Sequence, residues 1–296
     1  MGSYVRFLWR IFQLFIILIR GKTRIGSQTY RTRGLYLNKF ALSSTGTHEE
    51  WLNNVFAELL DLRKGTFIDV GANVGQTLIK ILRIDNDRQY IGFEPQIACS
   101  FFINRFLADN RLESHKIIPI GLSNHSGLVK LHTRNASDPA ASMIENFRPI
   151  NFYASYQYTY VARGDDVLSE FNIDAISVLK IDVEGGELEV MEGLTRIITQ
   201  HTPFIVFEVL NHYIAISNED LDSETLKFRE DRIKKIEHFI QEHGYSIYNI
   251  VSYTGFRKVA EIRPPRSANL RITDYVAVHK SDEDQFRTTI SKRLLE

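Results

Sequence analysis

The chain has 296 residues, of which 44% are hydrophobic and 24% are charged, and this composition is ordinary for a globular protein. Its one cysteine, Cys99, excludes an intramolecular disulfide and a cysteine-rich zinc site, and its apolar helical setting predicts a core residue. The net charge is zero, but residues 1–48 hold eight basic and no acidic residues, whereas the remainder holds 28 basic and 36 acidic ones. This remainder, with a net charge of −8, is not expected to bind nucleic acid.

Residues 1–47 form a basic and apolar N-terminal extension. Within it, Phe7–Ile19 is apolar except for Arg10 and Gln13, which is too short to span a bilayer comfortably. No small-residue cleavage site follows, as a signal peptide would require. Two interpretations stay open: a helix that lies in an anionic membrane interface, or a helix that packs on the protein body. The predicted localisation is cytoplasmic, with peripheral contact at the inner face of a membrane under the first interpretation.

Strands and helices are predicted to alternate through most of residues 48–280. The predicted helices span 48–62, 76–83, 99–107, 167–171, 187–198 and 231–242, and the predicted strands span 67–70, 89–93, 116–120, 128–133, 176–181, 204–209, 245–251 and 272–279. A hairpin turn is predicted at 124–127, loops at 134–151 and 211–230, and a polar tail at 281–296. The alternation predicts an α/β domain with a mostly parallel seven-stranded sheet and helices on both faces. Because no helix separates the last two strands, one antiparallel edge strand is expected.

The stretch T-F-I-D-V-G-A-N-V-G-Q-T at residues 66–77 predicts a buried strand, a glycine turn and a helix. This arrangement is typical of a nucleotide site, because Gly71 and Gly75 permit a tight turn and close approach of a ligand. A dinucleotide fingerprint would read G-x-G-x-x-G, whereas the spacing here is G-x-x-x-G. Asp69 precedes the glycines and suits a cationic, phosphate-free cofactor such as S-adenosylmethionine. An ordinary strand-to-helix turn is the alternative.

Four further residues are candidates for cofactor binding. Glu94 ends the next strand, about 20 residues beyond the turn, where a carboxylate accepts hydrogen bonds from ribose hydroxyls. It does not exclude NAD, and it could instead cap the following helix. Asn73 either binds the methionine end of the cofactor or stabilises the turn. Leu122 and Ser123 follow the third strand, where Leu122 is expected to pack on the adenine and Ser123 to bond its edge.

The stretch K-I-D-V-E-G-G-E at residues 180–187 carries the candidate catalytic residues. Asp182 and Glu184 alternate on an extended segment after a buried strand, so both are expected to face the cleft. Methyl transfer from such a cofactor needs an aligned acceptor, and the hydroxyl acceptor that the resemblance described next implies also needs a proton acceptor, for which Asp182 is the first candidate and Glu184 the second. The alternative is that these acids structure the loop and pair with Lys180. With Glu208 they offer oxygen ligands suited to magnesium or calcium, but the sequence defines no ligand set, so no metal is predicted.

Four motifs in this order carry a family resemblance: D-V-G-A-N-V-G at 69–75, F-E-P at 93–95, G-L-S-N-H-S-G at 121–127, and K-I-D-V-E-G-G-E at 180–187. Over residues 51–209 the chain resembles the FkbM-type S-adenosylmethionine-dependent methyltransferases. The resemblance implies a Rossmann-like class I methyltransferase fold. It also implies O-methylation of a hydroxyl on a glycan, glycolipid or small metabolite. An NAD-dependent oxidoreductase and a non-catalytic nucleotide-binding domain are the rival hypotheses. Residues 135–160 and 211–230 are expected to shape the acceptor pocket.

Overall fold

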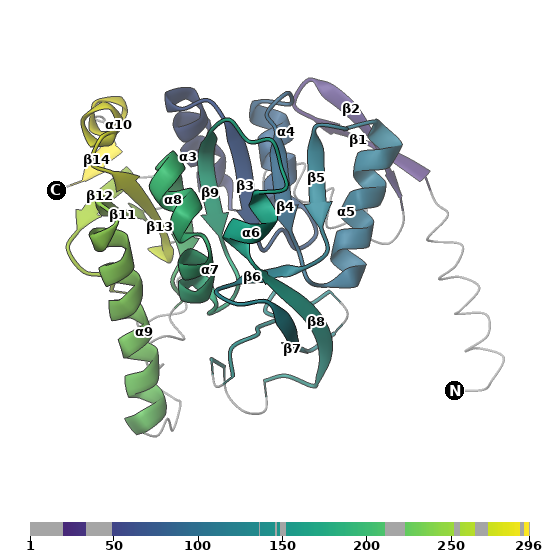
Figure 1. Cartoon of the computed structure of the whole chain (residues 1–296). Helices are drawn as coiled ribbons and strands as arrows, with labels where there is room; N and C mark the ends of the chain where they lie inside the picture. Colours follow the sequence, from purple (N-terminus) through teal and green to yellow (C-terminus); the bar gives the residue numbers. More distant parts are fainter. Residues whose placement is uncertain are drawn as a thin grey trace.

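The computed structural model describes residues 20–33, 49–135, 137–145, 147–148, 152–210, 223–251, 255–263, 272–290 and 293–295. The predicted apolar segment 7–19 lies outside these ranges, as do the first twelve residues of the predicted insertion at 211–230. Within the described ranges, a central sheet carries helices on both faces, and a small second sheet lies beyond one of its edges (Figure 1).

The central sheet has nine strands in the order β14-β12-β11-β13-β10-β9-β3-β4-β5. Its five neighbouring parallel strands are β10 (Phe204–Glu208), β9 (Ile176–Ile181), β3 (Thr66–Val70), β4 (Tyr90–Phe93) and β5 (His115–Ile118). Every residue of β3 and β9 is buried, as the near-continuous apolar runs in the sequence predict. The carboxyl ends of these five strands therefore meet at one edge of the sheet.

The expected single antiparallel edge strand is wrong in its position and in the strand count. β13 (Asp274–His279) is antiparallel to β10 and to β11 (Tyr245–Val251), so the reversed strand lies inside the sheet. The reason is the crossover from β10 to β11, which places β11 parallel to β10 one strand further out. Two strands then extend the sheet beyond β11, namely β12 (Gly255–Val259) and β14 (Leu294–Leu295).

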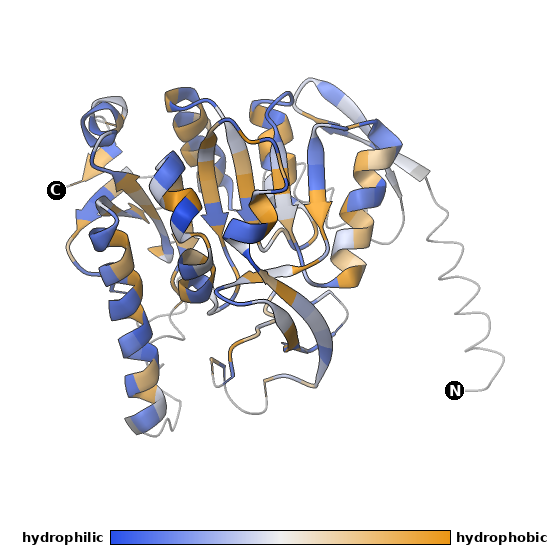
Figure 2. Ribbon diagram, viewed as in Figure 1, coloured by the Kyte–Doolittle hydropathy of each residue, from blue (hydrophilic) through white to orange (hydrophobic). Residues whose placement is uncertain are grey.

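Two hydrophobic clusters cover the two faces of the central sheet. One face packs against α3 (Glu50–Leu62), α4 (Gln76–Ile84), α5 (Ile97–Asn110) and α10 (Glu283–Thr289). The other packs against α6 (Gly164–Leu168), α7 (Glu187–Gly193), α8 (Thr195–His201) and α9 (Ser223–Glu242). Phe67 and Ile68 on β3 contribute to opposite clusters, as strand alternation requires. Figure 2 shows the apolar residues along the central strands, with polar residues on outer helix surfaces.

Three helical predictions need correction. The predicted helix 187–198 is divided at Leu194 into α7 and α8, because Leu194 has φ −112° and ψ 17°. The described end of the predicted insertion, residues 223–230, forms the first two turns of α9. The segment predicted as a polar tail contains α10, whose Phe286 is fully buried between Phe204, Tyr248 and Phe256. Cys99 is buried, as predicted.

The second sheet has the order β6-β8-β7, with β6 (Gly121–Ser123), β7 (Gly127–Thr133) and β8 (Ser155–Arg163). β8 is parallel to β6 and antiparallel to β7, so it separates the two strands that a hairpin at 124–127 was expected to join. The prediction failed because β8 comes from more than 20 residues further along the chain. This sheet lies below the carboxyl edge of the central sheet, where it closes one side of the cavity described below (Figure 1).

The described part of the N-terminal extension is a hairpin of β1 (Arg20–Ile25) and β2 (Gln28–Arg33). The Asn110 side chain at the end of α5 accepts a hydrogen bond from the Arg31 backbone N–H and donates one to the Arg31 carbonyl. This pair of bonds fixes the hairpin to the domain. No helix within the described ranges is long and apolar enough to cross a membrane.

Candidate active site

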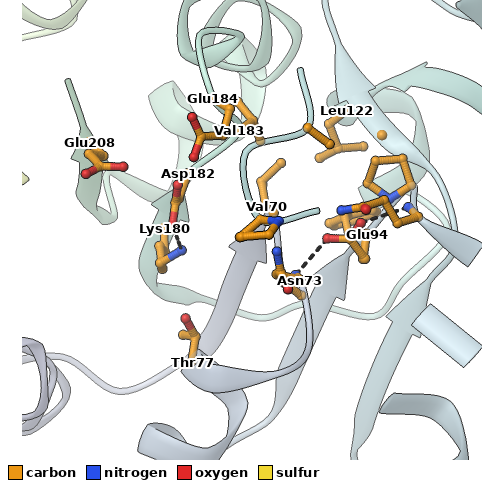
Figure 3. Close-up of a pocket in the computed structure, with 18 of the residues that line it drawn as sticks. Val70, Asn73, Thr77, Glu94, Leu122, Lys180, Asp182, Val183, Glu184 and Glu208 are labelled. Carbon is orange, nitrogen blue, oxygen red and sulfur yellow. Dashed lines mark hydrogen bonds and ion pairs between the residues drawn. The ribbon is translucent and has the colours of Figure 1, made fainter. Parts of the chain in front are cut away.

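A cavity of about 510 Å³ opens at the carboxyl edge of the parallel strands. The turn after β3, the ends of β4, β9 and β10, and residues of the second sheet line it. Its volume falls within the range of small-molecule sites, about 300–1,000 Å³. Glu94 lies at one end of the cavity and the Asp182–Glu184–Glu208 group at the other (Figure 3).

The glycine turn is held against the loop that follows β9. The backbone N–H of Asp182 donates to the Val70 carbonyl at 3.0 Å, and Gly71 lies directly after Val70 with φ 90°. A Cβ atom on Gly71 would lie 1.8 Å from the Asp182 carbonyl oxygen. Only glycine satisfies both the positive φ and this close approach. The turn thus brings the two predicted motifs into direct contact.

Glu94 is fully buried at the wall of the cavity. Its Oε2 accepts a hydrogen bond from the Asn73 backbone N–H at 2.7 Å, and its Oε1 accepts one from the Gln96 backbone N–H at 2.8 Å. Asn73 has φ 44°, a left-handed backbone conformation that the turn requires, and the residue also lines the cavity. Burial raises the pKa of Glu94 to about 7 although these two bonds lower it. Each carboxylate oxygen keeps a second lone pair for a ligand donor.

A second buried acceptor lies beside Glu94. The Gln96 side-chain Nε2 donates to the Asp138 carbonyl at 2.9 Å, and no described residue donates to its buried Oε1. Gln96 lines the same cavity. Leaving a buried acceptor unpaired costs about 1–3 kcal/mol, so this wall favours a ligand that brings hydrogen-bond donors.

At the opposite end, the carboxylates of Asp182, Glu184 and Glu208 converge from the ends of two neighbouring strands (Figure 3). Their nearest oxygens lie within 4.8 Å of one another. The Lys180 ammonium bonds Asp182 Oδ2 at 2.9 Å and lies 3.5 Å from Asp69 Oδ1. Burial alone would lower the pKa of Lys180, but the carboxylates of Asp182 and Asp69 raise it, so Lys180 is a charged partner for both.

Glu184 is held by a loop that covers the cavity. Arg148 forms an ion pair with the Glu184 carboxylate, and its guanidinium also lies 4.8 Å from the centre of the Phe152 ring. Ser142 donates from its hydroxyl to the Glu184 carbonyl at 2.7 Å. Burial raises the pKa of Glu184 to about 7 although Arg148 lowers it. The loop between β7 and β8 is therefore docked on the acidic motif and lines the cavity.

The cavity brings together six of the predicted site residues: Gly71, Asn73, Glu94, Leu122, Asp182 and Glu184. Asp69, Gly75 and Ser123 are not among the described lining residues. Asp69 is fully buried, and its Oδ2 accepts a hydrogen bond from Tyr90 at 2.5 Å. The Ser123 hydroxyl faces His125, and Gly75 precedes the first residue of α4.

Sequence reasoning did not place Gln96, Lys180 or Arg148 in the site. Lys180 appeared only as a partner for the acids, and no pattern connects Arg148 to Glu184 across 36 residues. Glu208 was considered only as an oxygen ligand. The signal that locates it is its position at the end of β10, next to β9.

The residues that line the cavity favour a sulfonium cofactor such as S-adenosylmethionine over a dinucleotide. The described lining residues include five acids, namely Glu49, Glu94, Asp182, Glu184 and Glu208. They include two bases, Lys180 and Arg148, and each is already paired with a carboxylate. These acids and the buried Gln96 Oε1 offer hydrogen-bond acceptors, which a pyrophosphate cannot satisfy, whereas a sulfonium cofactor brings ribose hydroxyls and an ammonium group as donors.

Comparison with known proteins agrees with this chemistry. A family model described as the methyltransferase FkbM domain matches residues 69–247. The chain belongs to the FkbM methyltransferase family. Its cofactor is S-adenosylmethionine, and its α/β architecture is the Rossmann-like fold of class I methyltransferases.

Two curated relatives match about half of the chain. The chain is 24% identical to the 2-O-methyltransferase NoeI of Sinorhizobium fredii over 161 residues, which cover 51% of this chain and 65% of the relative. It is 28% identical to the methyltransferase sdnD of Sordaria araneosa over 165 residues, covering 46% and 63%. The chain thus spans just under two thirds of the length of each relative.

Among solved structures, a crystal structure of methyltransferase FkbM from Methylobacillus flagellatus matches with a TM-score of 0.40 and 16% identity. The match covers 72% of this chain and 43% of that one. At this score the likeness does not bear on the activity of the FkbM domain described here.

Proposed function

We propose that this protein transfers a methyl group from S-adenosylmethionine to a hydroxyl oxygen of a glycan, glycolipid or small metabolite. The observation that carries the proposal is the group of converging carboxylates opposite Glu94 in one cavity. When bound, the cofactor supplies an electrophilic methyl group on a sulfonium. Carboxylates beside that methyl suit a neutral acceptor that donates hydrogen bonds, as a hydroxyl does. The printed name of NoeI, a 2-O-methyltransferase, agrees with an oxygen acceptor.

Glu94 and the glycine turn are proposed to hold the cofactor. The remaining lone pairs of Glu94 accept the ribose hydroxyls, and the unpaired Gln96 Oε1 accepts a further donor. Asn73 lies at the turn for the methionine end, and Leu122 lies at the wall for the adenine. This assignment keeps the acids at 182 and 184 free for the acceptor.

Asp182 and Glu184 are proposed to serve the chemical step. Each carboxylate is anchored by one cation, Asp182 by Lys180 and Glu184 by Arg148. An anchored carboxylate keeps its orientation, and orientation of the acceptor oxygen toward the methyl carbon contributes strongly to rate. Arg148 comes from the loop between β7 and β8, so this loop is proposed to contribute to acceptor choice.

The function is tested by tracing methyl label from S-adenosylmethionine into fractions of a cell extract. We expect label in a hydroxyl-bearing fraction, stable to mild base as an ether is and unlike a methyl ester. Calorimetry should show binding of S-adenosylmethionine and S-adenosylhomocysteine but not of NAD. Binding of NAD in place of these ligands would favour an oxidoreductase, and cofactor binding without transfer to any fraction would favour a non-catalytic domain.

Glu94→Ala should weaken S-adenosylhomocysteine binding by roughly 1.5–3 kcal/mol, because hydrogen bonds to a charged acceptor are lost. Since ribose hydroxyls favour the ionised carboxylate, wild-type affinity should also rise as pH increases through about 7, the pKa of Glu94. Calorimetry at several pH values measures both effects. Glu113→Ala, an exposed site, is the control. Undiminished binding by a folded Glu94→Ala protein would remove this residue from the cofactor site.

The N-terminal extension is proposed to bind an anionic membrane, as a lipid-linked acceptor would require. Deletion of residues 1–20 removes three basic residues, each of which contributes about 1 kcal/mol near such a surface. We expect the truncated protein to lose binding to vesicles that contain anionic lipid, measured by co-sedimentation. A full-length Arg6→Glu/Arg10→Glu variant separates charge from apolar contact. If the full-length protein does not sediment with these vesicles at low salt, the proposal that the extension binds a membrane is wrong.

A further inference from the structure

Glu208 is the third carboxylate of the acidic group and has no role in the function proposed above. It ends β10, whose neighbour β9 leads into Asp182 and Glu184, so all three side chains reach the same corner of the cavity. Figure 3 shows Glu208 pointing toward Asp182. We propose that Glu208 receives the proton that the acceptor hydroxyl loses during methyl transfer. This inference rests on the proposed function.

The cations of the site are distributed unequally among the three acids. Lys180 occupies one oxygen of Asp182, and Arg148 occupies one oxygen of Glu184. Among the described residues, no basic side chain forms an ion pair with Glu208. Its Oε1 accepts a hydrogen bond from the Thr273 hydroxyl at 2.9 Å, which orients the carboxylate and leaves Oε2 for a ligand. Glu208 is therefore the acid whose charge the described residues do not neutralise.

The carboxylates that surround Glu208, together with its burial, make it a stronger base than an ordinary glutamate. The charged groups around it come from four elements: Asp182, Glu184 and Lys180 from β9 and its loop, Asp274 from β13, Glu49 from the start of α3, and Arg148 from the β7–β8 loop. Burial first, and then the carboxylates of Asp182 and Asp274, raise the pKa of Glu208 well above its ordinary range. A carboxylate of raised pKa is a stronger base near neutral pH than one paired with a cation.

The proposed step balances without a further reactant. As the acceptor oxygen forms its bond to the methyl carbon, the carbon–sulfur bond breaks and its electron pair stays on sulfur. The O–H bond of the acceptor breaks, and its proton passes to Glu208 Oε2 to give the neutral acid. Asp182 and Glu184 keep the hydroxyl in place, and the proton leaves Glu208 for solvent after product release.

The first test compares wild type with Glu208→Gln, using labelled S-adenosylmethionine and the extract fraction that accepts label from wild type. We expect a 10²–10⁴-fold lower turnover, the usual size for loss of a general base, with cofactor affinity retained. The wild-type rate should rise with pH through the pKa of Glu208, because the base must be ionised, and this rise should disappear in the variant. Glu242→Gln, the same change at an exposed position on α9, should leave both unchanged.

A second test needs no acceptor. In the complex with S-adenosylhomocysteine, infrared titration of wild type should show protonated carboxyl bands that are lost as pH rises. One of them should be absent from Glu208→Gln, while those of Glu94 and Glu184 remain. Thr273→Val removes the hydrogen bond that favours the ionised form, so the midpoint should move up by about one pH unit or more. Thr273→Ser, which keeps the hydroxyl, should restore it. A midpoint unaffected by Thr273→Val would show that the titrating band does not come from Glu208.

Three results would overturn the assignment. One is a folded Glu208→Gln protein with near wild-type turnover and an intact pH rise. Another is an infrared titration identical in wild type and variant. The third is turnover that requires a divalent cation, with magnesium binding lost in Glu208→Gln. In that case Glu208 would be a metal ligand and not the proton acceptor. If no fraction accepts label from wild type, the proposed function fails, and the infrared titration still decides whether Glu208 holds the proton.

Discussion

Asp182→Asn is expected to reduce turnover by about 10²–10⁴-fold while leaving cofactor affinity nearly unchanged. The amide keeps the shape of the side chain but removes its negative charge. That charge pairs with Lys180 and is proposed to orient the acceptor hydroxyl. Lys180 retains Asp69 as a partner at 3.5 Å, so the variant should fold. Single-turnover rates with labelled S-adenosylmethionine, together with calorimetry of S-adenosylhomocysteine, separate the chemical step from binding.

The pH profile distinguishes Asp182 from Glu208. If Asp182 orients the hydroxyl and Glu208 takes the proton, the rise of rate with pH persists in Asp182→Asn although the rate is low. Asp284→Asn, an exposed position on α10, controls for the chemical change. Turnover close to wild type in Asp182→Asn would make Asp182 a structural residue, and loss of the pH rise would make it the base.

Gly71→Ala should lower the free energy of unfolding by roughly 3–5 kcal/mol, because a positive φ and a collision each add a few kcal/mol. The new Cβ would lie 1.8 Å from the Asp182 carbonyl oxygen, a backbone atom that no side-chain rotation can move. Relief of this contact must separate the turn from the loop after β9, so cofactor binding should fall as well. Denaturant titration with an unchanged m-value measures the loss of stability.

The matched control is Gly127→Ala, where an added Cβ would meet nothing within 4 Å. It should cause a much smaller loss than Gly71→Ala. Equal losses at the two positions would show that the close contact between the turn and the acidic loop does not contribute to stability. Retention of cofactor affinity in Gly71→Ala would show that the turn tolerates this displacement.

Local patterns predicted the elements that build the part of the cavity around Glu94 and the glycine turn. The limits of β9 match the prediction, and β3 and α4 differ by one residue, since continuous apolar runs and flanking glycines fix where buried strands end. Glu94 and Asp182 were located for the same reason: each ends or follows such a strand. These features depend on residues close together in the chain, which a single sequence records.

Features that depend on contacts between distant segments were not predicted. β8 enters between β6 and β7, and β13 enters between β10 and β11, because strand pairing is decided by tertiary packing. The helix at 187–198 breaks at Leu194, whose side chain packs at the Gly164 backbone, where a Cβ would lie 2.4 Å from Leu194 Cδ2. Arg148 reaches Glu184 from a loop without periodicity, so its sequence gave no indication of the contact.

Under the proposed function, the carboxylate group also has a consequence for product release. Ionised carboxylates only accept hydrogen bonds, and a hydroxyl brings the proton that satisfies them. The methyl ether that replaces this hydroxyl has none to offer, so the half-buried oxygens of Asp182 and Glu184 lose a partner, at a cost of about 1–3 kcal/mol. If the proposed function is right, a site built this way binds its methylated product less well than its acceptor, which promotes product release and reduces product inhibition.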